Sequence, residues 1–190
     1  MNESWRLPRE YEEPFRDALD HAAKRRIGDL HALLRGLTEQ QATAAISLCG
    51  YVSAYIAIDV VERRWPTDAA VRRMAQKLAE VKVDRQYGVT EENVYLYLSK
   101  CALGFQSYAD VFGDAFGSLE ETLAAPFFFA TDMLAGFLPK NGQTIWEFLD
   151  VIEDAYEKAW LLDLNLLPAL MVRARMPQPE GASDGGGGSR

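Results

Sequence analysis

The side chains best placed to do chemistry are carboxylates that stand inside apolar stretches. Asp59 falls within the apolar run 56–61, and Asp132 follows the triple phenylalanine at 127–129. A buried carboxylate is costly unless it is paired, and such groups often mark functional sites. On a structural interpretation, Asp59 pairs with Arg63 one helical turn later, and Asp132 lies on the exposed edge of its helix.

The functional interpretation of the same carboxylates is a ligand pocket between helices. In this hypothesis Asp59 and Asp132 converge with Tyr51, Tyr55 or Tyr97. Aromatic and apolar walls with a few polar groups are typical of sites for small organic molecules. The sequence leaves both interpretations open.

Metal, cofactor and nucleophile chemistry have weaker support. Neither His21 nor His31 has a carboxylate three residues before it, which is the spacing that di-iron helical bundles use. Cys49 and Cys101 lie inside apolar helical patterns, which predicts two reduced, buried thiols rather than a disulfide or a redox pair. The chain has no Gly-x-Ser-x-Gly, no phosphate-binding glycine loop and no dinucleotide fingerprint. We therefore expect no metal and no cofactor, and catalysis is not the favoured role.

One segment resembles a DNA-binding unit. In residues 83–98, Gly-Val-Thr at 88–90 followed by a short helix is similar to the turn and recognition helix of many bacterial repressors. That resemblance implies a helix that enters a DNA groove. However, Asp84 stands where those families place a small residue, and Glu91 and Glu92 would face phosphates with like charge. An ordinary turn and helix cap is the alternative, and we expect no nucleic-acid partner.

Charge is distributed unevenly along the 190 residues. The net charge is -8; residues 62–109 carry eight basic and six acidic side chains (+2), and residues 110–165 carry two and eleven (-9). An acidic surface disfavours nucleic acids and anionic membranes, and it suits either a basic protein partner or plain solubility. No secretory signal pattern follows Met1, which predicts a cytoplasmic protein. The most apolar stretch, 46–61, is 16 residues long, too short to span a membrane, and reads as a buried central helix.

Hydrophobic spacing predicts an all-α, single-domain bundle of about six or seven helices over residues 1–175. No period-two alternation indicates a sheet. Pro168 is expected to kink the chain, and the glycine-rich residues 176–190 form a disordered tail. The helices are expected at 11–37 with a bend at Gly28, at 39–64 behind a Thr38 and Gln41 capping box, at 68–82, after Thr90, from Ser118, at 127–138 and at 145–160.

These observations leave three classes of function. The first is a non-catalytic helical binding or regulatory module that acts through protein-protein contacts. The alternative is a small-molecule-binding helical bundle with an apolar, aromatic pocket between helices. A degenerate helix-turn-helix protein, or a helical enzyme without a short motif, comes third. A homodimer in which the basic third helix meets the acidic last helix is compatible with each class.

Overall fold

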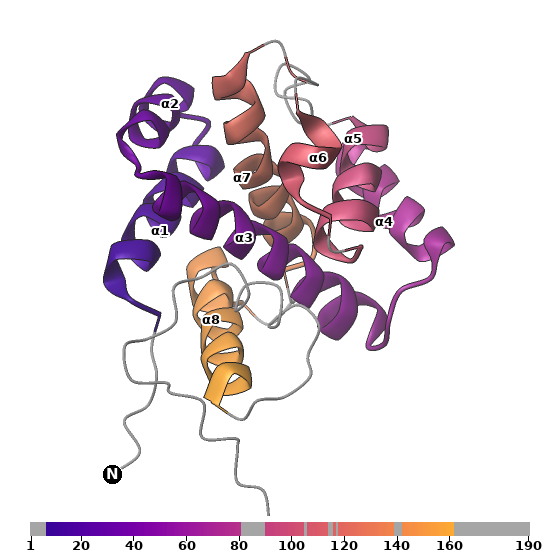
Figure 1. Cartoon of the computed structure of the whole chain (residues 1–190). Coiled ribbons are helices and arrows are strands. Elements are labelled where there is room, and N and C mark those ends of the chain that lie inside the picture. The colour runs from indigo at the N-terminus through magenta and orange to yellow at the C-terminus, as the bar shows by residue number, and fades with distance from the viewer. Residues whose placement is uncertain are drawn as a thin grey trace, which may run out of the picture.

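Helices form every regular element in the part of the chain that the structure describes. This computed structural model describes residues 7–80, 90–104, 106–113, 116, 118–138 and 142–161. The all-α prediction is confirmed (Figure 1). The elements are α1 (Arg9–Ala23), α2 (Ile27–Gly36), α3 (Glu39–Tyr55) with its π-helical extension η1 (Ile56–Glu62), α4 (Asp68–Glu80), α5 (Glu91–Leu96) with its π-helical extension η3 (Tyr97–Ala102), α6 (Tyr108–Phe112), α7 (Leu119–Gly136) and α8 (Ile145–Leu161).

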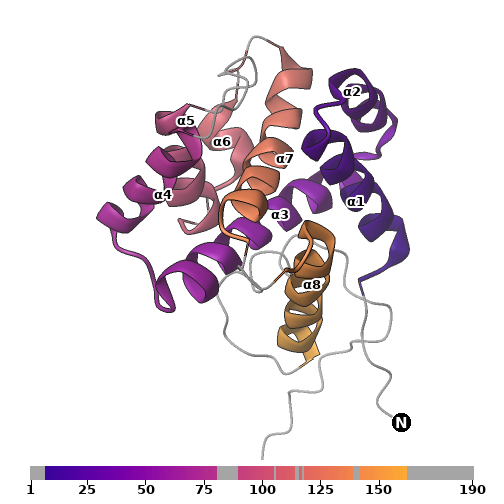
Figure 2. The same ribbon diagram turned by 180° about the vertical axis from the view of Figure 1, so that it is seen from behind.

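The centre of the protein is made by α3 and α7, which pack against each other. In Figures 1 and 2, α1 and α2 lie on one side of this pair and α4 to α6 lie on the other. The aromatic run Phe127, Phe128 and Phe129 of α7 is fully buried, as is most of α3. Helices that are apolar on most faces belong in such a central position. The predicted central helix is therefore confirmed as largely buried up to Ala57, whereas its last residues, 58–61, are half-buried or exposed.

The continuous helix Glu39–Glu62 has the length and composition of a membrane span. It has 24 residues and a mean hydropathy of 1.8, and no other helix in the described ranges is as long and apolar. In the fold, 61% of the most apolar 18-residue stretch of this helix is buried inside the protein, as expected for the core helix of a soluble protein.

Two predicted helix boundaries are wrong. The expected single helix over 11–37 is two helices, because the chain turns at Lys24 and Arg25, where Arg25 adopts a left-handed conformation (φ 54°). Gly28, the expected bend, lies inside α2. The two helices expected on either side of Pro126 are instead one, α7. Proline removes one backbone hydrogen bond there, and the buried aromatic run that follows holds the helix together.

Local caps begin the helices where the sequence predicts them. The Thr38 hydroxyl accepts a hydrogen bond from Gln41 N at 3.2 Å, and Thr38 N donates to the Gln41 side chain at 3.0 Å. Ser118 and Thr90 cap α7 and α5 in the predicted positions. The sequence reading missed one capping box, formed by Thr144 and Glu147 at the start of α8.

Several predictions fall on residues outside the described ranges. These are the first part of the helix-turn-helix resemblance (83–89), the kink at Pro168 and the tail at 176–190. Cys49 and Cys101 are both buried and are not joined to each other, in agreement with the prediction of two buried thiols.

Candidate functional site

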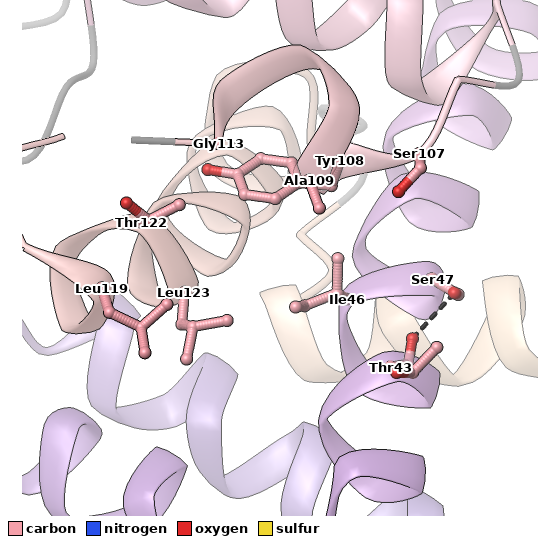
Figure 3. A pocket seen from close by; sticks show the side chains of 10 residues that line it. All are labelled: Thr43, Ile46, Ser47, Ser107, Tyr108, Ala109, Gly113, Leu119, Thr122 and Leu123. Carbon is pink, nitrogen blue, oxygen red and sulfur yellow. Dashed lines mark hydrogen bonds between the residues drawn. The ribbon is translucent and has the colours of Figure 1, made fainter. Parts of the chain in front are cut away.

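A hollow of about 380 Å³ lies between α3, α6 and α7 (Figure 3). Its volume is within the range of sites that bind small organic molecules. Ten residues line it: Thr43, Ile46 and Ser47 from α3, Ser107, Tyr108, Ala109 and Gly113 from the ends of α6, and Leu119, Thr122 and Leu123 from α7. The lining therefore joins a segment of α3 to two neighbouring segments, α6 and the start of α7, that lie about 60 to 80 residues later in the sequence.

Helical spacing explains how each segment presents its side chains to the hollow. Residues three and four positions apart share one helix face, so Ile46 and Ser47 lie beside Thr43, as Thr122 and Leu123 lie beside Leu119. The third wall, α6, is only five residues long. A helix this short covers little of the groove between α3 and α7, and the hollow occupies the space beside it.

Among the ten described residues of the lining, the polar side-chain groups are all hydroxyls and none is charged. Ser47 donates its hydroxyl hydrogen to the Thr43 carbonyl oxygen at 2.8 Å, and Thr122 donates to the Ser118 carbonyl oxygen at 2.9 Å. Both hydroxyls thus bond within their own helices or caps, and Figure 3 shows the bond of Ser47. Their oxygens retain lone pairs with which to accept further hydrogen bonds.

Tyr108 is the distinctive residue of the site. Its ring extends over the hollow in Figure 3. The ring packs edge-on against Tyr97, with the ring centroids 6.4 Å apart, and it packs in a tilted arrangement against Phe112, with the centroids 4.8 Å apart. The side chain is only 6% exposed, and its hydroxyl has no hydrogen-bond partner among the described residues. Burial raises the pKa of the Tyr108 phenol, so the group is a neutral donor at physiological pH.

A second, smaller hollow of about 20 Å³ lies next to the first, and we call it the inner hollow. It shares Ile46, Ser47 and Tyr108 with the larger space, so these three residues stand between the two. The remaining lining is Gly50, Tyr51, Tyr97 and Cys101. A space of this size holds about one water molecule.

Two of the predicted site tyrosines line the inner hollow, and one does not. Tyr51 and Tyr97 are both buried there, and the Ser53 hydroxyl lies 3.4 Å from the Tyr97 hydroxyl. The ring of Tyr55 lies 6.4 Å from the ring of Tyr51, and Tyr55 lines neither hollow. Burial raises the pKa of Tyr51 and Tyr97, which keeps both phenols neutral.

The two predicted carboxylates line neither hollow. Asp59 is exposed in η1, and within the described ranges it forms no ion pair with Arg63, which has a left-handed backbone (φ 52°) just after the helix ends. The expectation that Asp132 lies on an exposed helix edge is wrong. Its side chain is 11% exposed and pairs with Arg25 at 2.7 Å, because the turn between α1 and α2 covers this part of α7.

The sequence reading missed most of the residues that line the larger hollow. Thr43, Ser107, Tyr108 and Thr122 are not among the site residues that the sequence predicts. One signal was available, because Ser47 and Thr122 place hydroxyls on buried positions of apolar helices. Polar side chains on a buried face point either to a helix bond or to a site.

No group of three histidine, cysteine, aspartate or glutamate side chains gathers to hold a metal ion within the described ranges. Comparison of the chain with protein families, with curated proteins and with solved structures finds no match. The interpretation of the hollow therefore rests on its own residues.

Proposed function

We propose that this protein binds a small, mainly apolar organic molecule in the hollow between α3, α6 and α7. The observation that carries the proposal is the hollow of about 380 Å³ with the buried hydroxyl of Tyr108 at its wall, to which no described residue supplies a hydrogen-bond partner. An apolar space with a few fixed polar groups is the usual form of a ligand site. Binding of a small molecule is the alternative expectation from the sequence, and the hollow supports it.

The chemistry of the walls supports an apolar ligand. Ile46, Leu119 and Leu123 supply aliphatic surface, and the ring of Tyr108 supplies an aromatic one. Transfer of apolar surface from water to such walls is favourable by about 25 cal/mol per Å². The hydroxyls on α3 and α7 then give the ligand orientation rather than most of its affinity.

A protein partner is the second candidate function, and one observation favours it. Leu119, at the rim of the hollow, is 73% exposed, the most exposed large hydrophobic side chain in the described ranges. An exposed leucine beside an apolar hollow offers a place where an apolar side chain of another protein docks. In that case the hollow is the receiving pocket of an interface.

The predicted charge-paired homodimer gains no support from the charged side chains. The basic side chains of α4 contact the chain's own groups, and so do two acidic side chains of α8. These contacts are Arg72 with Asp68, Arg73 with Glu62, Lys77 with the Gly136 carbonyl, and Arg16 with both Asp150 and Glu153. A dimer held by these charges would have to compete with pairs that are already formed, and the dimer stays a prediction that light scattering at low and high salt would check.

A thermal-shift screen with small neutral aromatic compounds tests the proposal. Ile46→Trp places a large ring in the hollow, and Thr43→Trp does so from a more exposed position that disturbs folding less. Val151→Trp, on the exposed face of α8, adds the same side chain away from the site. We expect the compounds to raise the melting temperature of the wild type and of Val151→Trp, and to lose this effect in both blocking variants.

The competing outcomes are also distinct. Equal shifts in all four proteins would place binding elsewhere and overturn the proposal. If no compound shifts the wild type, but Leu119→Glu abolishes the capture of a defined protein partner, the second candidate function replaces the first.

A further inference from the structure

We infer that the ligand of this hollow is uncharged and carries a hydrogen-bond acceptor, such as a ketone, ester or amide oxygen, for the Tyr108 hydroxyl. The inference rests on the proposed function and adds the chemical class of the ligand. It excludes carboxylates, phosphates and amines as the preferred ligands of this site.

The absence of charge in the lining carries the first half of the inference. None of the ten lining residues is acidic or basic. A carboxylate or an ammonium group that entered would lose its hydration and meet no opposite charge, which is strongly unfavourable. A neutral molecule loses little by the same transfer.

The beginning of α7 does not supply the missing positive charge. A helix N-terminus carries a partial positive charge, and Leu119 at the rim is the first residue of this helix. However, Glu120 and Glu121 occupy the first turn, and the Ser118 hydroxyl already accepts a hydrogen bond from Glu121 N at 3.2 Å. Carboxylates in the first turn offset the partial charge of the helix, so an anionic ligand gains little there.

The hydrogen-bonding capacity of the lining carries the second half. Ser47 and Thr122 already donate their hydroxyl hydrogens to backbone carbonyl oxygens, at 2.8 and 2.9 Å. Tyr108 differs from both, because its hydroxyl is buried and bonds to no described residue. A buried donor without an acceptor is unfavourable, so a ligand oxygen that reaches it stabilises the complex.

The position of Tyr108 sets the orientation of the ligand. Its side chain lines both the larger hollow and the inner hollow. The acceptor of the ligand then lies at the hydroxyl end of the ring, which Figure 3 shows on the side of Thr122 and Gly113. The apolar body extends outward past Leu123 to Leu119 at the rim.

Four naphthalene derivatives that share one apolar body test the inference by fluorescence titration. They are 2-acetylnaphthalene with a neutral acceptor, 2-ethylnaphthalene without one, 2-naphthoate as an anion, and 2-naphthylmethylamine as a cation. We expect the acetyl compound to bind wild-type protein about tenfold more tightly than each of the other three.

Tyr108→Phe is the decisive variant, and Tyr95→Phe is its control, because Tyr95 is half-buried in α5, lines neither hollow and donates its hydroxyl hydrogen to Asp68 at 2.5 Å. Tyr108→Phe should remove the preference for the acetyl over the ethyl compound and leave the affinity for the ethyl compound within about twofold. Its melting temperature without ligand should not fall, because the deleted hydroxyl has no partner. Tyr95→Phe should retain the full preference.

The outcomes separate this inference from the proposed function. If naphthoate or the amine binds as tightly as the acetyl compound, or if Tyr108→Phe retains the preference, the inference is overturned and the binding site stands. If none of the four compounds binds wild-type protein more tightly than the blocked Ile46→Trp variant, the proposed function fails and the inference fails with it.

Discussion

The guanidinium of Arg25 lies 2.7 Å from a carboxylate oxygen of Asp132, across a separation of 107 residues. The same guanidinium lies over the ring of Phe128, with its carbon 5.1 Å from the ring centroid. Through these two contacts the turn between α1 and α2 is fixed to the middle of α7. The other carboxylate oxygen of Asp132 is buried and has no partner in the described ranges, so Arg25 is the group that compensates this charge.

Arg25→Met should lower the free energy of unfolding by about 2 kcal/mol at pH 7, because it leaves the Asp132 carboxylate largely buried without a counter-charge. Methionine keeps the bulk of the side chain and experiences the same left-handed backbone. Urea unfolding measures the change. Lys24→Met is the matched control, since its ion pair with Asp20 is exposed and should contribute less than about 1 kcal/mol. Equal effects of the two substitutions would contradict the role assigned to Arg25.

Glu153 should make the folded state less stable as the pH rises from about 4.5 to 7. Burial raises the pKa of Glu153 to about 7, in spite of its hydrogen bond to Arg16. Between these pH values the folded protein holds a proton that the unfolded chain has released, so stability falls with rising pH. Glu153→Gln cannot titrate, and it should gain about 1–3 kcal/mol over the wild type between pH 5 and pH 8 in urea unfolding.

A carboxylate on the same helix provides a contrast of opposite sign. Hydrogen bonds from the backbone and side chain of Thr144 lower the pKa of Glu147. The stabilisation of the folded state by ionised Glu147 is therefore present above the pKa that this group has in the unfolded chain, and it is lost as the pH falls. Glu147→Gln should be less stable than wild type at pH 8 and should approach it at low pH. If both variants moved in the same direction with pH, the assignment for Glu153 would be wrong.

Gly104 should not tolerate a side chain. A Cβ atom at this position would lie 2.4 Å from the carbonyl oxygen of Ser99, a backbone atom that cannot move aside without reshaping η3. The π-helical bond from Leu103 N to the Leu98 carbonyl, at 2.9 Å, brings the chain back this closely. Gly104→Ala should cost about 2 kcal/mol or more in thermal unfolding.

Gly28→Ala is the control for this comparison. Gly28 lies inside α2, and nothing would lie within 4 Å of an added Cβ. Alanine in an open helical position stabilises a protein by about 0.5–1 kcal/mol. A loss of stability at Gly28 equal to that at Gly104 would show that steric contact is not the cause.

Thr38→Ala should lower stability by about 1 kcal/mol, because it removes the cap of the central helix. Thr38→Ser keeps the hydroxyl and should be close to wild type in chemical unfolding. The Gln41 side chain also donates to the Glu10 carbonyl of α1 at 3.1 Å. A large loss in Thr38→Ser would point to the methyl group rather than to the cap.

Local signals in the sequence were sufficient for the helix starts. Thr38 with Gln41, Ser118 and Thr90 are caps whose partners are three residues away, so their geometry depends little on the rest of the fold. The break between α1 and α2 is different in kind. Arg25 turns the chain while paired with Asp132, and no local pattern reveals a partner 107 residues away.

The hollow was not predictable for a related reason. Ser47 and Thr122 are polar residues in apolar helices, but the space beside them depends on how α3, the five-residue α6 and α7 pack against one another. The spacing of apolar residues in a sequence indicates which face of a helix is buried. It does not indicate where two packed helices leave a space between them. Tyr51 and Tyr97, two of the predicted site residues, line the inner hollow. Their aromatic character was the only reason to select them from the sequence.

The bonds that join α1 to α8 set an order of events during synthesis. The Arg16 guanidinium of α1 donates a hydrogen bond to Asp150 of α8, 134 residues later in the sequence. The Leu7 backbone N–H donates to the Glu157 carboxylate. At ribosomal rates of about 5–20 residues per second, α1 is made on the order of ten seconds before these partners. During that interval Arg16 and the Leu7 backbone lack these partners, whereas α1 packs mainly against α2, α3 and α7. Completion of α8 therefore closes the polar contacts of this N-terminal segment and not its apolar packing.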